Sequence, residues 1–464
     1  MAEDVFIDPW SSSQSTDYDA IRDRFGLSDL ELDKLPSPSM LHRRGIVFAH
    51  RDLDLILDAQ RLGEPFGVLT GLMPSGRMHL GHSMVIEQVK WFQEMGADVT
   101  IAVADLEANA TRGMSLSKCR ELAISEYVHN YAALGLDPDR CEIYFQSGRH
   151  IVQRMGFTLG KKTNLSEFEA IYGFKGETNL AHVQAPLVQA GDILHPQLDE
   201  YGGLRPIVVP VGVDQDPHLR LTRGLAAKTN WFNVKPRKMG GLAIGLSIQD
   251  ENAERLGSLP NGRVDKTVRA SVFEQLTNTL RELGFADILL NPKHGLVELP
   301  AATSGDKNRV RMAMLKLERK LGGPGLLQPS STYHRFAIGM TGDKMSSSRP
   351  KTTIFLDDDV AVMSKKIKSA VSGGQATVEE QRRLGAECDK DVAYQYLTFF
   401  FEKDDTALAE IRDSYSSGRI LSGEVKQLCI DAASDWLTDL AERRDSWANR
   451  LDEFLADDDV DSKT

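Results

Sequence analysis

The segment from Met73 to Phe92 constrains the fold of this chain most strongly. In Met73-Pro-Ser-Gly-Arg-Met-His-Leu-Gly-His82, proline and glycine interrupt the strand expected before it, and a helix with Val85, Val89 and Phe92 on one face should follow. A strand, a glycine loop and a helix start leave unpaired backbone N–H groups that point at one spot. Because such a spot attracts phosphate, the segment predicts an anion site in a layered α/β domain.

The surrounding pattern predicts a parallel sheet wrapped by helices. Apolar runs alternate with helix-like stretches through the first half of the chain, and residues 99–105 and 206–214 are typical of buried strands that end in an acid. Pro210 suits a strand end or an irregularity better than a central position. Residues 117–135 should form an amphipathic helix ended by glycine. Ligands bind at the carboxyl ends of parallel strands, which is where Glu107 and Asp214 fall.

Two histidines give the first segment its chemistry. His79 and His82 are three residues apart at the expected helix start, so both rings can donate to phosphate oxygens as charge develops there. Gly81 lets a nucleotide lie against the backbone. The other interpretations are a pair of surface histidines in a turn, or a metal pair that lacks its third ligand.

A second polar segment, Thr341-Gly-Asp-Lys-Met-Ser-Ser-Ser348, is predicted to be a mobile loop. Lys344 offers a point charge for the β- and γ-phosphates, and the serines offer donors to a leaving pyrophosphate. Alone, such a loop is more often a flexible connector; with the histidine segment, it predicts a split ATP site. The catalytic residues are then His79, His82, Lys344, Ser346 and Ser347. Further ATP contacts come from Pro74, Ser75, Gly76, Gly81, Met345 and Ser348.

Composition excludes several classes of protein. The net charge of −12 argues against a protein that coats DNA or RNA nonspecifically. No run of residues is apolar enough for a membrane span, and the acidic N-terminus does not resemble a signal peptide, so we expect a cytoplasmic protein. The four cysteines are widely spaced without neighbouring histidines, which predicts buried free thiols and no protein metal site.

Changes in composition and in the spacing of apolar residues divide the chain into five parts. We expect an N-terminal extension packed on the catalytic domain (1–60), a first catalytic part (61–233), an inserted subdomain (234–332), a catalytic part with the second ATP segment (333–370) and a helical domain (371–464). Within the insert, residues 306–320 carry six cations and two acids, either on a solvated helix face or in contact with a tRNA backbone. The acidic residues 457–461 are expected to be frayed and solvated.

The two ATP segments resemble the paired signatures of class I aminoacyl-tRNA synthetases. Residues 42–52, 184–197 and 212–223, together with 372–380 and 388–396, are similar to the tryptophanyl-tRNA synthetases of archaeal and eukaryotic type. The resemblance covers nearly the whole chain except the insert. It implies a Rossmann-like doubly wound α/β fold with an inserted subdomain and an all-helical C-terminal domain that contacts the anticodon.

The resemblance also implies roles for single residues. Gly212 and Asp214 would hold the ribose region of ATP, and Glu107 would accept the indole N–H of tryptophan. A helix-start acid that serves only the helix dipole is the other interpretation of Glu107. Two positions depart from the family: Leu69 stands where a tyrosine is expected, and Ala102 where a glutamine is expected. The remaining tryptophan contacts would be Gly71, Gln189 and Gln215.

The implied reaction has two steps. Tryptophan attacks the α-phosphate of ATP, with Mg²⁺ accompanying the ATP, and the 3′ end of tRNA(Trp) then takes the tryptophanyl group. The family further implies a homodimer, and no role with membranes or DNA. Two alternatives stay open: tyrosine charging on the sister fold, and a catalytically silent relative that only binds RNA.

Overall fold

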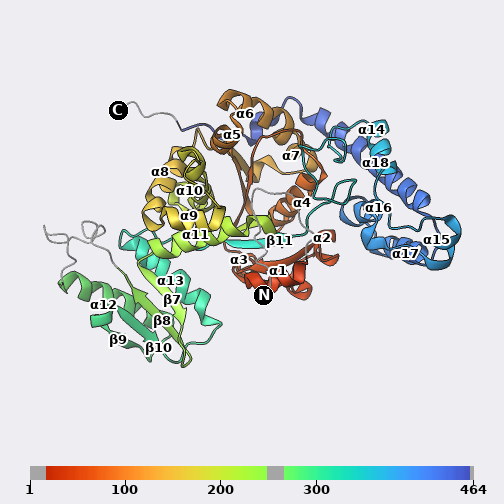
Figure 1. Cartoon of the computed structure of the whole chain (residues 1–464). Coiled ribbons are helices and arrows are strands. Elements are labelled where there is room, and N and C mark those ends of the chain that lie inside the picture. The colour runs from red at the N-terminus through yellow and green to blue at the C-terminus, as the bar shows by residue number, and fades with distance from the viewer. Residues whose placement is uncertain (1–16, 248–265, 460–464) are drawn as a thin grey trace.

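A seven-stranded sheet forms the centre of the computed structural model, which describes residues 17–247 and 266–459 (Figure 1). The strand order is β1 (Ser28–Asp29), β2 (Val47–Arg51), β11 (Ser330–His334), β6 (Ile207–Gly212), β3 (Gly67–Leu72), β4 (Asp98–Val103) and β5 (Cys141–Phe145). The strands from β11 to β5 are parallel, whereas β1 and β2 add an antiparallel edge. The predicted doubly wound parallel sheet is confirmed, and the N-terminal residues extend it.

The helices around this sheet follow the predicted alternation. Residues 117–135 form one continuous helical stretch that consists of α6 (Leu116–Leu122), a π-helical turn (Ala123–Val128) and α7 (His129–Leu134), and it ends at Gly135 in the left-handed conformation. The other helices of this domain are α1 (Tyr18–Phe25), α2 (Met40–Arg43), α3 (Asp54–Leu62), α4 (Leu80–Glu94), α5 (Asp105–Arg112), α8 (His150–Leu159), α9 (Leu165–Tyr172), α10 (Leu180–Leu194) and α11 (Asp216–Thr229).

Pro210 lies inside β6, where it shapes the cleft. It pairs with Thr332 of β11, whereas the pairing of β6 with β3 stops at Val208. Proline has no N–H to donate, so β6 cannot continue its ladder with β3 beyond this point. The chain also reverses its direction of winding between β3 and β6, and ligands bind at such a switch point. The sheet therefore opens where a ligand is expected.

The insert forms a second sheet with its own core. Its strands are β7 (Phe232–Pro236), β8 (Leu242–Leu246), β10 (Leu296–Leu299) and β9 (Leu289–Asn291), in that order and all antiparallel. Apolar side chains of β7, β8 and β10 pack against α12 (Lys266–Glu282) and α13 (Asp306–Lys320). Because β11 belongs to the central sheet, the boundary that the sequence suggests at residue 332 falls within a strand.

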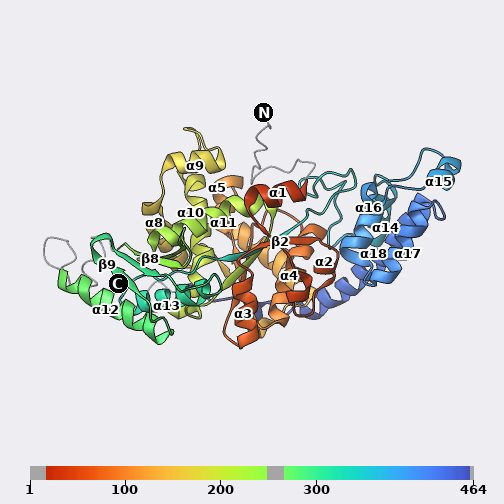
Figure 2. The same cartoon turned by 90° about the horizontal axis from the view of Figure 1, so that it is seen from below.

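The regular elements of the C-terminal part are helices within its described residues, apart from one β-bridge at Leu455. It contains α14 (Val360–Lys368), α15 (Val378–Leu384), α16 (Val392–Tyr396), a π-helical turn (Leu397–Phe401), α17 (Asp405–Ser416) and α18 (Ser422–Trp447). Both views place these helices and the insert on opposite sides of the central sheet (Figures 1 and 2).

The end of the chain returns from α18 to the edge of the central sheet. Leu455 pairs with Ile143 of β5, and Asp459 accepts the backbone N–H of His150 at the start of α8. Asp458 also forms an ion pair with Arg120. The expectation of a frayed acidic tail is therefore wrong for Asp458 and Asp459, and Asp461 lies outside the described residues.

Two predictions from composition can be compared with the fold. All four cysteines are free and buried, as predicted. Across residues 17–247 and 266–459, no helix has the length and apolar character that a membrane crossing requires.

Candidate active site

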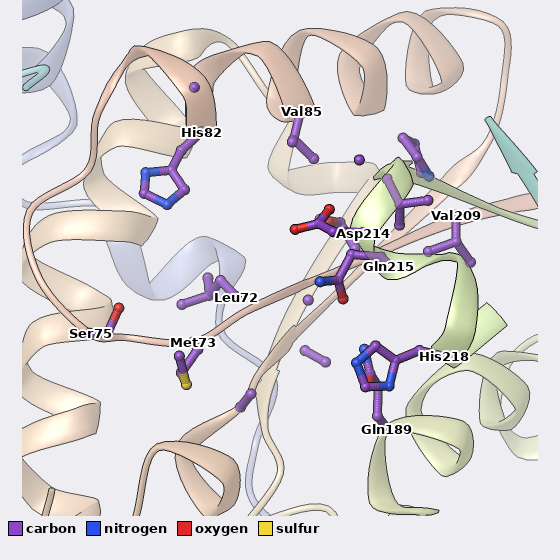
Figure 3. Close-up of a pocket in the computed structure, with 18 of the residues that line it drawn as sticks. Leu72, Met73, Ser75, His82, Val85, Gln189, Val209, Asp214, Gln215 and His218 are labelled. Carbon is purple, nitrogen blue, oxygen red and sulfur yellow. The ribbon is translucent and has the colours of Figure 1, made fainter. Parts of the chain in front are cut away.

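One cavity of about 820 Å³ lies at the carboxyl ends of β3, β4 and β6. It brings together the two polar segments and the acids that follow the strands. The predicted residues that line it are Gly71, Ser75, His79, Gly81, His82, Glu107, Gln189, Gly212, Asp214, Gln215, Lys344, Met345, Ser346, Ser347 and Ser348. Pro74 and Gly76 lie outside its lining; an added Cβ on Gly76 would lie 3.5 Å from Ser347. Figure 3 shows Ser75 and His82 on one side and Gln189, Gln215 and His218 on the other.

The two histidines cap the start of α4 in a reciprocal arrangement. Nδ1 of His79 accepts the N–H of Gly81 at 3.1 Å, and Nδ1 of His82 accepts the N–H of His79 at 3.1 Å. Their rings stack with centroids 3.8 Å apart. Since each Nδ1 is an acceptor, each neutral ring carries its proton on Nε2. The sequence spacing thus produces two N–H donors at one helix start.

Both rings are held in the neutral form. Burial lowers the pKa of His82 to about 4, with Lys344 as a second cause. Burial also brings the pKa of His79 well below its ordinary value, assisted by His82 and Lys344. Neutral imidazoles still donate hydrogen bonds to phosphate, but they do not titrate near neutral pH. The interpretation of these residues as surface histidines is wrong because His79 is buried.

Side chains of the π-helical turn Ala123–Val128 contact this first segment. Oε1 of Glu126 accepts the backbone N–H of Met78 at 2.8 Å, and the ring of Tyr127 meets His82 edge to face at 5.9 Å. A π turn inserts one extra residue into a helix and is often found at functional sites. Here it directs two consecutive side chains at the same loop. The sequence places Tyr127 on an amphipathic helix but does not reveal the turn.

The second segment folds back over the first. Nζ of Lys344 lies 2.6 Å from Oδ2 of Asp214 and 4.2 Å from the centroid of Phe336. The hydroxyl of Ser347 donates to the carbonyl of Arg77 at 3.1 Å. The two halves of the predicted ATP site are therefore in contact, and the loop expected to be mobile is anchored at both residues in this structure.

Gly212 allows the close approach of the groups around Lys344. A Cβ at this position would lie 2.7 Å from Oδ1 of Asp214 and 2.9 Å from the ring of Phe336. Both distances are too short for a side chain. This steric requirement explains a glycine directly before the acidic turn.

Two carboxylates line the other half of the cavity. Glu107 is half-buried, and desolvation raises its pKa to about 7, although Arg112 acts in the opposite direction. Asp192 on α10 is 2% exposed, and burial likewise raises its pKa to about 7. Its two oxygens accept hydrogen bonds of 2.5 Å from Tyr144 Oη and Gln146 Nε2. The sequence predicts a role for Glu107 but none for Asp192.

The two departures from the family pattern adjoin Asp192. Leu69 packs in one apolar cluster with Ile193, the residue next to Asp192. Ala102 lies opposite Tyr144 in the parallel pairing of β4 with β5. The small side chain of Ala102 thus stands beside the tyrosine that binds Asp192. Leu69 and Ala102 line the cavity together with Gln146 and Asp192.

His218 is a second lining residue to which the sequence analysis gives no role. It is buried on α11, and its ring shares a hydrogen bond of 3.0 Å with the hydroxyl of Tyr172. Burial lowers its pKa to about 4, so its ring lines the cavity in the uncharged form. His218 lies within residues 212–223, whose resemblance to the synthetase family was the sequence signal that could have identified it. Across the described residues, no group of three or more His, Cys, Asp or Glu could hold a metal ion.

The chain matches the family model of class I tRNA synthetases (W and Y) over residues 60–240 and 310–438. It is 42% identical over 456 residues to the tryptophan–tRNA ligase of Methanosarcina acetivorans, covering 97% of this chain and 98% of the relative. It is 38% identical over 442 residues to the ligase of Archaeoglobus fulgidus, covering 95% of this chain and 97% of the relative.

A solved structure agrees with these matches. The tryptophanyl-tRNA synthetase of Aeropyrum pernix aligns with a TM-score of 0.71 at 34% identity, covering 97% of this chain and 99% of that one. Residues 241–309 lie outside the family model. The match to the Methanosarcina relative spans 97% of this chain, so it runs across these residues.

Proposed function

Because the chain belongs to the class I tRNA synthetases for tryptophan and tyrosine, we propose that it is a tryptophan–tRNA ligase. It activates tryptophan with ATP and transfers the tryptophanyl group to the 3′ end of tRNA(Trp), with release of AMP and pyrophosphate. The observation that carries this conclusion is the single cavity that joins a closed two-segment phosphate site to a pocket with buried carboxylates. The relatives named tryptophan–tRNA ligase support the choice of amino acid.

The nucleotide half supplies fixed donors to the phosphates. Nε2–H groups of His79 and His82 face the α-phosphate, and Lys344 with Ser346, Ser347 and Ser348 faces the departing pyrophosphate. Pro74, Ser75, Gly76, Gly81 and Met345 shape the loop walls, while Gly212 and Asp214 hold the ribose region. Preorganised donors in a site that excludes water stabilise the transition state without reorganising during the reaction. Mg²⁺ bound to the ATP substrate would neutralise part of the phosphate charge.

The amino-acid half gives separate partners to the indole and the ammonium. We assign the indole N–H to Asp192, because Tyr144 and Gln146 fix this buried carboxylate and each of its oxygens can still accept a further hydrogen bond. We assign the ammonium to Glu107, for which the sequence suggests the indole N–H instead. In the described residues Glu107 makes no side-chain hydrogen bond or ion pair, so an incoming cation would restore its lost solvation. Gly71, Gln189 and Gln215 complete the pocket.

Charging of tRNA tests this function directly. Purified enzyme with ATP, Mg²⁺ and labelled tryptophan should attach tryptophan to tRNA in a form that is stable in acid and released by mild base. Tyrosine in place of tryptophan serves as the control for the sister specificity. Absence of amino-acid attachment, with tRNA binding retained, would instead favour the catalytically silent RNA-binding protein.

We also propose a homodimer in the cytoplasm whose helical domain, residues 371–464, contacts the anticodon. Three large apolar side chains are exposed on consecutive helices: Phe157 on α8 (75%), Leu165 on α9 (59%) and Leu180 on α10 (84%). Exposed apolar residues of this size suit a protein interface. Sedimentation of the wild type and of a Leu180→Lys variant would measure the association.

A further inference from the structure

We propose that the inserted subdomain binds the phosphate backbone of tRNA in a groove between α12 and the β9–β10 hairpin. This inference rests on the proposed function, which makes tRNA a substrate. It assigns a role to the part of the chain that the family model leaves unmatched. The proposal stands on the charge of the insert, on the use of its cations and on the shape of one groove.

The insert has the opposite charge from the rest of the protein. Residues 234–332 contain fifteen Lys and Arg and ten Asp and Glu, which gives a net charge of +5. The whole chain carries −12, so the remaining residues together carry −17. A polyanion approaching this protein is therefore repelled by most of its surface and attracted to the insert. Such asymmetry is typical of a localised nucleic-acid contact.

The sequence suggests the cations of α13 as an RNA contact. Half of them instead form ion pairs within the protein. Arg309 pairs with Asp306 at 2.7 Å on the same helix. Arg319 reaches Asp199 at 3.2 Å, and Arg311 lies 3.7 Å from Asp52. The last two pairs join the insert to the catalytic domain. Three of the six cations are therefore already engaged by acids.

Within the described part of the chain, the cations of the α12 groove are not paired with acids. A groove of about 660 Å³ is lined by Arg269 and Arg281 of α12 and by Lys293 of the β9–β10 connection. All three side chains are exposed, and none forms an ion pair or a side-chain hydrogen bond within the described residues. Glu274 is the acid in this lining. The groove thus combines three available cations with one acid.

The spacing of these cations suits an extended anion. Arg269, Phe273, Thr277 and Arg281 recur every four residues and so share one face of α12. Twelve residues of helix separate the two arginines by about 18 Å. Lys293 lies on the β9–β10 side of the groove, whose lining also includes Phe273 and Leu290. A small anion would meet one cation at a time, whereas a sugar–phosphate chain can meet all three.

The position of the groove fits a second contact on one large substrate. The insert and the helical domain lie on opposite sides of the catalytic domain in both views (Figures 1 and 2). A tRNA that enters the central cavity with its 3′ end can therefore meet positive charge away from the proposed anticodon contact. The insert would add affinity through the backbone and leave the choice of bases to other contacts.

A charge-neutral variant tests the groove. R269Q/R281Q/K293Q should weaken the binding of full-length tRNA(Trp) about ten-fold at moderate salt, because three phosphate contacts are lost. The dependence of log affinity on log salt concentration should become shallower by about 2 to 3. The matched control is K34Q/K118Q/K161Q, which removes the same charge from three exposed lysines outside the insert. The charge-preserving variant R269K/R281K/K293R should keep most of the affinity.

Tryptophan-dependent pyrophosphate exchange without tRNA separates this proposal from the proposed function. The neutral variant should exchange at the wild-type rate and unfold at the wild-type temperature, while its KM for tRNA rises. If the triple variant misfolds, the single variant Arg281→Gln is measured against Lys118→Gln in the same assay. A tRNA affinity and salt dependence equal to those of the control would overturn the proposal. If the wild-type protein shows no tryptophan-dependent pyrophosphate exchange, the proposed function is overturned, whether or not the groove binds tRNA.

Discussion

Lys344 and Asp214 form an ion pair of 2.6 Å between Nζ and Oδ2, although 130 residues separate them in the chain. The pair joins the second ATP segment to the turn after β6, and the ring of Phe336 supports the same ammonium. The ammonium of Lys344 is thus held inside the cavity, beside the turn after β6. We propose that Lys344 contributes to catalysis by positioning charge.

Replacing Lys344 with alanine should reduce the rate of adenylate formation by about 10²–10³-fold, as for the loss of one preorganised transition-state donor. The affinity for tryptophan should change much less, because the Lys344 ammonium pairs with Asp214, whereas the proposed partners of tryptophan are Glu107 and Asp192. Pre-steady-state adenylate formation and equilibrium binding of tryptophan measure the two effects. Equal losses in both would show that Lys344 does not act on the transition state.

Asp192→Asn should raise the KM for tryptophan about ten- to a hundred-fold, since a hydrogen bond to a charged group contributes about 1.5–3 kcal/mol. The KM for ATP should stay close to the wild-type value. Glu107→Gln is the matched variant, and it should weaken the binding of tryptamine as well as tryptophan because both ligands carry the ammonium. Indole-3-propionate lacks the ammonium, so it should respond to Asp192→Asn but not to Glu107→Gln. The reverse pattern would show that Glu107, and not Asp192, accepts the indole N–H.

Tryptophan affinity should fall as the pH drops below about 7. Burial raises the pKa of both Glu107 and Asp192 to about 7, and both must be ionised to accept the ligand's donors. Protonation on the acid side therefore competes with binding, whereas carboxylates with ordinary pKa values would show no change between pH 6 and 8. The KM for ATP should be flat over this range because the pKa of His82 is about 4. A tryptophan KM that does not vary from pH 6 to 8 would contradict the ionised pair.

Glu126→Ala should slow adenylate formation about five- to a hundred-fold, because the buried N–H of Met78 loses its acceptor at a cost of about 1–3 kcal/mol. Glu126→Gln keeps an acceptor oxygen and should restore most of the rate. The ratio of these two rates, measured beside the thermal unfolding of both variants, separates positioning from stability. Equal rates for alanine and glutamine at equal stability would exclude the positioning role.

Local sequence was enough to predict much of this site. The positions of His79, His82 and Lys344 follow from a glycine loop before a helix and from a short polar loop, and both patterns involve neighbouring residues only. The apolar composition of residues 99–105 and 206–214 also predicts two buried strands. Their carboxyl ends place Glu107 and Asp214 at the cavity because parallel strands share one direction.

Contacts between distant residues were not predictable in the same way. Asp192 becomes a fixed acceptor only because Tyr144 and Gln146 from the β5 region reach it. Glu126 faces Met78 because a π turn shifts the register of a helix whose apolar spacing alone predicts an α-helix. Pro210 was expected at a strand end or an irregularity, and it lies inside β6 just after the pairing with β3 stops. Each of these features depends on which segments become neighbours in the fold.

Exchange of labelled pyrophosphate into ATP is the most direct test of the central claim. The reaction should proceed when tryptophan is added, should be near background with tyrosine or with no amino acid, and should be lost in the Lys344→Ala variant. Exchange that depends on tyrosine would assign the sister specificity. Absence of amino-acid-dependent exchange in a folded protein would contradict the proposed enzyme.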